Sequence, residues 1–312
     1  MTNTLKLKGR EMARGLRFPE GPIAMQDGSV LLVEIERGTL TRVTASGKVE
    51  VVAETGGGPN GAALGPDGKA YICNNGGFNW HKEAGGYMRP NGRADAYSGG
   101  RIDRVDLETG KVETLYKECS GVPLKGPNDI VFDGKRGFWF SDLGKVYDRQ
   151  MDRGALYYAR TDGSLIKEAA FPIITPNGVG LSPDGSTLYF AETETSRLWS
   201  FRITGEGELE KQPWPSVHGG KIVAGLPGYQ RFDSMAVEEN GNVCVATLMR
   251  GGISVISPAG EWLEFHEAPE HYCTNICFGG PGMRKAYVTL SNYGTLLEVD
   301  WPRPGLRLHH QK

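Results

Sequence analysis

The sequence predicts an all-β fold, specifically a six-bladed β-propeller with four antiparallel strands in each blade and a metal in its central channel. Three observations predict the propeller. The 312 residues include 45 glycines and 18 prolines, as expected of many short strands joined by tight turns. A unit of polar residue, strand, turn and strand recurs six times, and a further strand pair follows each copy. Long helices are not expected.

The recurring unit is clearest in Pro176–Glu192, PNGVGLSPDGSTLYFAE. Apolar residues alternate with polar ones around Val179 and Leu188, and Asp184-Gly185 supplies a hairpin turn between the two strands. The other five copies are Phe18–Glu34, Pro59–Asn74, Pro127–Asp142, Phe232–Thr247 and Cys273–Thr289.

A second pattern, glycine followed by alternating apolar residues and another turn, comes after each unit. Examples are Gly38–Val43 and Gly100–Val105. Each repeat therefore holds four strands, and repeats of roughly 40 to 70 residues favour radial repetition around a channel over a sandwich. Because no linker-like segment interrupts the chain, residues 1–312 are predicted to form a single propeller domain.

Charge and cysteine content restrict the classes of partner. A net charge of −2 and a pI near 6.3 give no electrostatic basis for binding nucleic acid or an anionic membrane. The five cysteines have no zinc-ligand spacing, and the N-terminal residues lack the apolar core of a signal peptide. We therefore expect a cytoplasmic protein, a monomer or weak homo-oligomer, that acts on a small molecule.

The polar residue that opens each unit is the main candidate for chemistry. The first strand of a propeller blade lines the channel, so these six residues should converge at one height. They are Glu20, Asn60, Asn128, Asn177, Asp233 and, less clearly, Asn275. An asparagine between proline and glycine is also a common turn element, so no single copy decides the matter. Glu20 and Asp233 favour a metal, because an unpaired carboxylate facing a channel is costly.

Carboxylates and amide oxygens without histidine or cysteine form a hard ligand set. This set predicts one divalent cation, with Ca²⁺ as the first choice and Zn²⁺, Mn²⁺, Mg²⁺ or Fe²⁺ as alternatives. The predicted ligands are Glu20, Asn128, Asn177 and Asp233. No G-x-S-x-G elbow supports a serine hydrolase, and no glycine-rich phosphate loop stands in the right context.

Several motifs carry a family resemblance that runs through nearly the whole chain. FPEGP, GPND, TPNGVGLSPDGSTLYFAET, FDSMAVEENGNVCVAT and CFGGP followed by AYVT resemble the senescence-marker-protein/gluconolactonase family, also called regucalcin-like. The resemblance implies a six-bladed propeller that hydrolyses lactones with one divalent metal. It places metal ligands on Glu20, Asn177 and Asp233, and a contact to metal or substrate on Asn128. It extends to phosphotriesterase relatives that bind calcium through a similar set.

One position departs from the family pattern. Sugar-lactonase members often carry a substrate-binding arginine two residues before the third-blade asparagine, where this chain has Gly126. An aldonolactone substrate is therefore in doubt. Residues 76–98 form the longest insertion and are expected to be a lid loop over the metal. A rim flap that merely packs on the propeller is the alternative.

Further residues are candidates for binding substrate. Besides Asn60 and Asn128, they are His81, Arg89, Arg93 and Tyr147. The stretch Tyr229-Gln230-Arg231 and the pair His271-Tyr272 are predicted to shape the pocket, whereas His218 and His266 are predicted to lie at the surface.

The leading functional hypothesis is a metal-dependent lactonase. The metal would polarise the ester carbonyl as a Lewis acid. The resemblance implies that Asp233 would serve as both ligand and general base for the attacking water. Organophosphate or phosphotriester hydrolysis at the same metal is a second hypothesis. A calcium-binding propeller without catalytic activity is a third.

Overall fold

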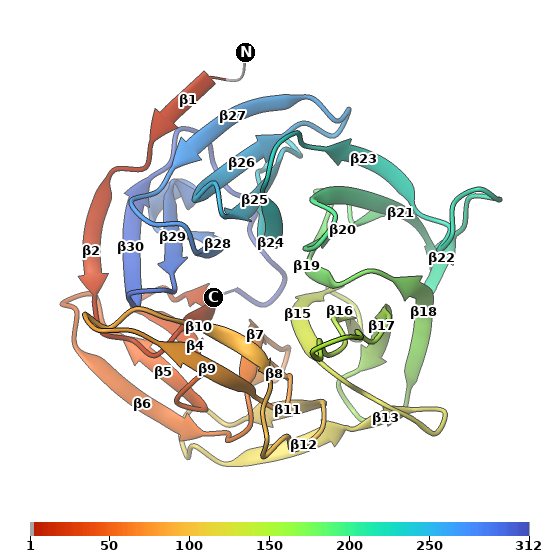
Figure 1. The fold of residues 1–312 in the computed structure, drawn as a ribbon, viewed down its shortest axis with the longest axis horizontal. Coiled ribbons are helices and arrows are strands. Elements are labelled where there is room, and N and C mark those ends of the chain that lie inside the picture. Colours follow the sequence, from red (N-terminus) through yellow and green to blue (C-terminus); the bar gives the residue numbers. More distant parts are fainter. Residues whose placement is uncertain (1–2, 312) are drawn as a thin grey trace.

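The computed structural model describes residues 3–311. Six β-sheets of four or five strands stand around a central channel (Figure 1). Within the described residues, the single helical element is a short 3-10 turn, Pro281–Met283. The predicted all-β, six-bladed propeller is confirmed.

The innermost strand of each blade is the first strand of one repeat. Each inner strand contacts the next around the ring, and the sixth contacts the first, so the ring is closed. The six inner strands are β3 (Pro19–Ala24), β7 (Pro59–Leu64), β15 (Pro127–Phe132), β19 (Pro176–Leu181), β24 (Arg231–Val237) and β28 (Cys273–Gly279).

The outer strands follow in chain order from the channel to the rim. In the first blade they are β4 (Val30–Glu34), β5 (Thr39–Val43) and β6 (Val49–Glu54). In the second they are β8 (Ala70–Asn74), β11 (Arg101–Val105) and β12 (Val112–Tyr116). In the third they are β16 (Gly137–Asp142), β17 (Gly154–Arg160) and β18 (Ile166–Ile173). In the fourth blade they are β20 (Thr187–Glu192), β21 (Arg197–Gly205), β22 (Glu208–Glu210) and β23 (Lys221–Gly225). In the fifth they are β25 (Val243–Leu248), β26 (Gly252–Ile256) and β27 (Trp262–Glu267). In the sixth they are β29 (Lys285–Leu290) and β30 (Thr295–Asp300). A small ribbon, β13 (Glu118–Cys119) and β14 (Val122–Pro123), leads into the third blade.

The N-terminal segment adds outer strands to the last two blades. β2 (Gly9–Ala13) pairs antiparallel with β30 and supplies the outermost strand of the sixth blade. β1 (Asn3–Lys6) then adds to the fifth blade, parallel to β27 (Figure 1). Both pairings join segments more than 250 residues apart in the sequence, so neither appears as a local sequence pattern.

Apolar residues pack between neighbouring blades. Tyr71 and Phe138, for example, belong to a cluster that joins the second and third blades, and Phe190 lies in the next cluster. The prediction that His218 and His266 lie at the surface is wrong, because both are buried. His218 packs its ring edge against Trp199, and His266 lies on Trp301.

The C-terminal segment crosses the end of the channel opposite the start of the inner strands. The backbone nitrogen of Leu306 donates to the carbonyl of Val237, and Gln311 donates through Nε2 to the carbonyl of Phe278. In Figure 1 the C-terminus accordingly lies near the middle of the ring. The described part of the chain contains no helix with the length and hydropathy needed to cross a bilayer.

Candidate functional site

The six polar residues predicted to converge in the channel are called the ring residues below. All of them lie near the start of an inner strand, at the same end of the channel. They are Glu20, Asn60, Asn128, Asn177, Asp233 and Asn275. In every inner strand the pairing register shifts at this point, as between Glu20 and Ile23 in β3 and between Pro176 and Val179 in β19. Bulges of this kind bend a strand and turn a side chain away from its regular direction. The repeated bulge therefore explains how six strand residues can face the channel mouth together.

The glycine after the ring residue has a packing role. A Cβ on Gly61 would lie 2.4 Å from the carbonyl oxygen of Asn128, and one on Gly178 would lie 2.8 Å from that of Asp233. Neighbouring inner strands thus approach too closely for any side chain. Asn60 and Asn177 lie inside strands, so the turn interpretation of the PNG motif does not apply to them.

Glu20 is held in one orientation by two hydrogen bonds. Its Oε2 accepts from Nδ2 of Asn275 at 2.7 Å and from the backbone nitrogen of Gly21 at 2.8 Å. Burial raises the pKa of Glu20 to about 7, although both hydrogen bonds act in the opposite direction. Asn275 therefore positions a carboxylate from the neighbouring blade.

The amides of Asn177 and Asn128 differ in their partners. Asn177 donates through Nδ2 to Oγ1 of Thr193 at 3.1 Å, and its Oδ1 accepts from Oγ of Ser234 at 3.3 Å. Among the residues that the structure describes, Oδ1 of Asn128 is buried and has no hydrogen-bond partner. Buried acceptors are normally satisfied, so this atom is suited to an additional ligand.

A third carboxylate, Asp129, was missed by the sequence reasoning. It is buried, and it accepts from the backbone nitrogen of Ile130 at 2.9 Å and from that of Val179 at 3.1 Å. The bond from Val179 ties β15 to β19, the two strands that carry Asn128 and Asn177. The available signal was its position directly after Asn128, where the other PN copies have glycine.

The three carboxylates affect one another. Burial, together with the charge of Glu20, raises the pKa of Asp129 to about 7. The side chain of Asp233 is partly exposed. Even so, burial in the channel and the charge of Glu20 raise the pKa of Asp233 well above its usual value. Grouping these charges without a cation is costly, because each disfavours ionisation of the others.

These features fit a hard divalent cation. Glu20 and Asp233 would provide the charge, and Asn128 and Asn177 the neutral oxygens, which are ligand types that Ca²⁺ accepts. Within residues 3–311, no group of three or more histidine, cysteine, aspartate or glutamate side chains is arranged to hold a metal. The candidate centre is of a different kind, because half of its predicted ligands are amides.

A cavity of about 190 Å³ lies over the ring. Five of the six ring residues line it, namely Glu20, Asn60, Asn128, Asn177 and Asp233. The remaining lining residues are Phe18, Ile35, Phe78, Pro90, Leu143, Val146, Thr175, Thr193, Glu194, Arg231, Leu248 and Tyr272. The structure thus places the predicted metal ligands together on the floor of a cavity that can hold a small molecule.

Four predicted substrate-binding residues do not line this cavity. His81 pairs with Glu83 at 2.9 Å on the exposed side of the 76–98 segment, opposite Arg89. The guanidinium of Arg93 lies over the rings of Tyr97 and Tyr147, at 5.2 and 5.5 Å. The predicted role in binding substrate stays a prediction for these four residues, His81, Arg89, Arg93 and Tyr147. Their positions do not favour it, because none of them lines the cavity. Asn60 and Asn128 do face the cavity.

The arginine that lines the cavity is Arg231, from one of the stretches predicted to shape the pocket. Its Nη2 pairs with Oε2 of Glu194 at 3.0 Å. Tyr272 also lines the cavity. By contrast, Tyr229 is exposed, and Gln230 is buried with its amide bonded to the carbonyl of Pro227.

The segment predicted as a lid loop contains a β-hairpin, β9 (Phe78–Lys82) and β10 (Met88–Arg93). It reaches from the second blade to the sixth, where Met88 and Asn292 exchange two hydrogen bonds of 3.0 and 2.8 Å. At its base, Nζ of the buried Lys145 donates to the carbonyl of Gly77 at 3.1 Å. The hairpin is therefore anchored at both ends.

Gly126 is enclosed by the backbone. A Cβ at this position would lie 2.4 Å from the carbonyl oxygen of Gly144, and the Gly126 nitrogen donates to Oδ1 of Asp142 at 2.7 Å. The local backbone therefore leaves no room for an arginine there. This explains in structural terms why the chain departs from the sugar-lactonase pattern at Gly126.

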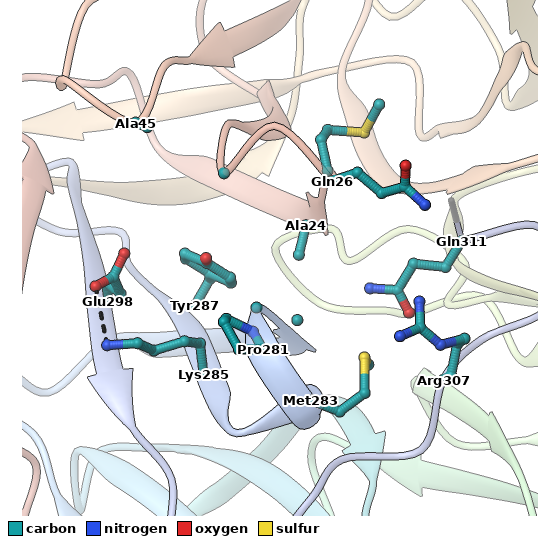
Figure 2. Close-up of a pocket in the computed structure, with 14 residues that line it drawn as sticks. Ala24, Gln26, Ala45, Pro281, Met283, Lys285, Tyr287, Glu298, Arg307 and Gln311 are labelled. Carbon is teal, nitrogen blue, oxygen red and sulfur yellow. Dashed lines mark hydrogen bonds and ion pairs between the residues drawn. The ribbon is translucent and has the colours of Figure 1, made fainter.

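A larger cavity, of about 400 Å³, lies at the opposite end of the channel between the first and sixth blades. Figure 2 shows Lys285 paired with Glu298 beside Tyr287, with Arg307 and Gln311 on the other side of the cavity. None of the six ring residues lines it. We therefore place the candidate active site at the ring.

Fold and site together define the class of protein: a six-bladed β-propeller with a carboxylate and amide centre at one mouth of its channel. A model of the SMP-30/Gluconolactonase/LRE-like region matches residues 18–292. The chain belongs to this family.

Individual proteins of known sequence or structure are also similar to this chain. A gluconolactonase from Zymomonas mobilis is 24% identical over 300 residues, which cover 87% of this chain and 76% of that protein. A diisopropyl-fluorophosphatase from Loligo vulgaris is 30% identical over 210 residues, covering 62% and 63% of the two chains. The crystal structure of a calcium-binding protein, regucalcin, from Agrobacterium tumefaciens superposes with a TM-score of 0.74 at 19% identity, covering 99% and 100%.

Proposed function

We propose that this protein is a divalent-metal-dependent hydrolase that opens lactone rings. The observation that carries the proposal is the convergence of Glu20, Asn128, Asn177 and Asp233 on the floor of one cavity, where Oδ1 of Asn128 has no partner among the described residues. The gluconolactonase relative and the family membership support lactones as the substrate class.

The chain's own residues supply orientation and proton transfer. Asn275 and the Gly21 nitrogen fix Glu20, and Thr193 fixes Asn177. When bound, a divalent cation, with Ca²⁺ as first choice, would polarise the ester carbonyl and stabilise negative charge on its oxygen. Asn128 faces the cavity, where its amide can contact the substrate.

Asp233 is the proposed general base. Its carboxylate lines the cavity together with the other predicted metal ligands, and this position supports the role. The oxygen of a water molecule bonds to the carbonyl carbon as Asp233 accepts the water's proton. The ring C–O bond then breaks, and the proton passes to the departing alkoxide, so that a hydroxy acid is released.

The decisive test is Asp233→Asn, assayed at saturating Ca²⁺ with a pH indicator against a panel of sugar and non-sugar lactones. We expect the turnover rate to fall by about 10²-fold or more, with the fold retained. The matched control, Asp300→Asn, changes a carboxylate whose side chain is 89% exposed and should leave turnover unchanged. Near wild-type hydrolysis by the Asp233 variant would overturn the assignment.

Organophosphate hydrolysis is the second candidate, and the diisopropyl-fluorophosphatase relative from Loligo vulgaris favours it. The same floor residues would act on a phosphoryl oxygen in place of a carbonyl oxygen. Measuring fluoride release from diisopropyl fluorophosphate beside lactone hydrolysis would rank the two activities. A non-catalytic calcium-binding propeller is less favoured, because an ion with a purely structural role does not require an open cavity above it.

A further inference from the structure

The cavity over the ring is uneven in polarity. Its floor is polar, but its walls are mainly apolar and come from four different blades and the hairpin. The apolar wall consists of Phe18, Ile35, Phe78, Pro90, Leu143, Val146, Leu248 and Tyr272. Above the ring residues, the polar groups of the lining are the side chains of Thr175, Thr193, Glu194 and Arg231, together with the hydroxyl of Tyr272.

These four polar side chains are already engaged within the protein. Oγ1 of Thr175 accepts from the backbone nitrogen of Glu194 at 3.0 Å, and Oγ1 of Thr193 accepts from Asn177. Glu194 and Arg231 pair with each other. These four side chains keep some bonding capacity, but all of them lie on the fourth and fifth blades. A ligand hydroxyl that faced the apolar wall would be buried without a partner, which is costly.

The apolar wall is held in place by packing. The ring centroids of Phe18 and Trp80 lie 5.1 Å apart, and those of Phe18 and Tyr272 lie 6.3 Å apart. Nζ of Lys145 lies 4.3 Å from the ring centroid of Phe78. Because these residues are fixed before a ligand arrives, their shape and polarity can select the ligand.

The volume suits one ring with a short substituent. A cavity of about 150 Å³ lined by apolar side chains is known to hold benzene, and this one has about 190 Å³. The polar floor would take the ester group, and the remaining volume faces the apolar wall.

Resting on the proposed lactonase function, we infer that the substrate is a lactone carrying an alkyl or aryl group, and not a polyhydroxylated sugar lactone. Its ester lies toward the ring residues, and its apolar part lies against Phe18, Phe78 and Tyr272.

The test compares two lactones with the same six-membered ring: δ-nonalactone, which carries a butyl group, and D-glucono-δ-lactone, which carries hydroxyls. We expect kcat/KM for δ-nonalactone to be at least about tenfold higher. Val146→Thr keeps the side-chain shape but adds a hydroxyl to the wall, and it should narrow this ratio by about threefold to tenfold. Val51→Thr, on the exposed strand β6, is the matched control and should leave the ratio unchanged.

A binding experiment separates this inference from the lactonase proposal. The lactam analogues of both compounds resist hydrolysis, and their affinities can be compared by calorimetry. Tighter binding of the butyl lactam without turnover of either lactone would support the apolar ligand class and overturn the lactonase function. Equal or better turnover of the sugar lactone would overturn the inference and leave the lactonase function intact. No turnover together with no preference between the lactams would overturn both.

Discussion

Asn275 in the last blade donates a 2.7 Å hydrogen bond from Nδ2 to Oε2 of Glu20 in the first blade. The two residues are 255 positions apart in the chain, and their contact spans the junction at which the propeller closes. An amide from the final repeat thus orients a predicted metal ligand of the first. This contact gives Asn275 a positioning role that its sequence context suggested only weakly.

We predict that Asn275→Ala weakens cation binding. Removing a group that orients a metal ligand typically lowers affinity by about 10- to 100-fold. Calcium titration by calorimetry would measure the change, with circular dichroism to confirm that the fold is kept. Gln212→Ala, an exposed side chain on the fourth blade, serves as the control. Unchanged affinity in the Asn275 variant would show that Glu20 is oriented without it.

We expect chelation to lower both stability and activity. A ligand that binds only the folded state at about 100 times its Kd stabilises it by about 2.7 kcal/mol. Treatment with EDTA should therefore lower the thermal midpoint and stop lactone hydrolysis, and added Ca²⁺ should restore both. In Glu20→Gln the midpoint should respond little to EDTA. An identical midpoint with and without chelator in the wild type would count against a metal at the ring.

Gly126→Ala should destabilise the protein. The added Cβ would lie 2.4 Å from the carbonyl oxygen of Gly144, so the backbone must shift, at a cost of about 1–3 kcal/mol. Urea unfolding measures this change in the free energy of unfolding. The matched control is Gly205→Ala, where the nearest atom is the flexible carboxylate end of Glu208 at 3.0 Å. Equal stability of the two variants would show that the turn around Gly126 can open.

Lys145 should make stability depend on pH. Burial lowers the pKa of Lys145 to about 7 from its usual value near 10.5. The positive charge of Arg93 also lowers this pKa, whereas the negative charges of Asp142 and Asp152 raise it. Between these two values the unfolded chain binds a proton that the folded protein does not. This contribution to the free energy of unfolding is therefore lowest below pH 7 and rises as the pH increases toward 10.5.

The Lys145→Met variant removes this titration. From pH 7.5 to 9.5, the wild type should gain about 2 to 3 kcal/mol of stability relative to the variant, as measured by urea unfolding. Lys117→Met, at an exposed lysine, should show no such trend relative to the wild type. A pH-independent difference between wild type and Lys145→Met would mean that Lys145 keeps an ordinary pKa in the fold.

The fold could be predicted because every blade repeats one short pattern. The polar residue, the alternating strand and the Asp-Gly turn of Pro176–Glu192 are local features, and six copies of them indicated the ring of residues at the channel mouth. The hairpin within residues 76–98 was harder to predict, because its anchors, Asn292 and Lys145, lie in other blades.

The sequence by itself determined the number of blades, the inner strands and the residue type at each ring position, since these depend on local alternation and turn chemistry. Tertiary structure decided which side chains reach the cavity. Arg93 lies over Tyr97 and Tyr147, whereas Arg231 lines the cavity and pairs with Glu194. The physical reason is that strand pairing and bulges set the direction of each side chain, and contacts between distant blades set its neighbours. Neither is encoded in the spacing of residues along one strand.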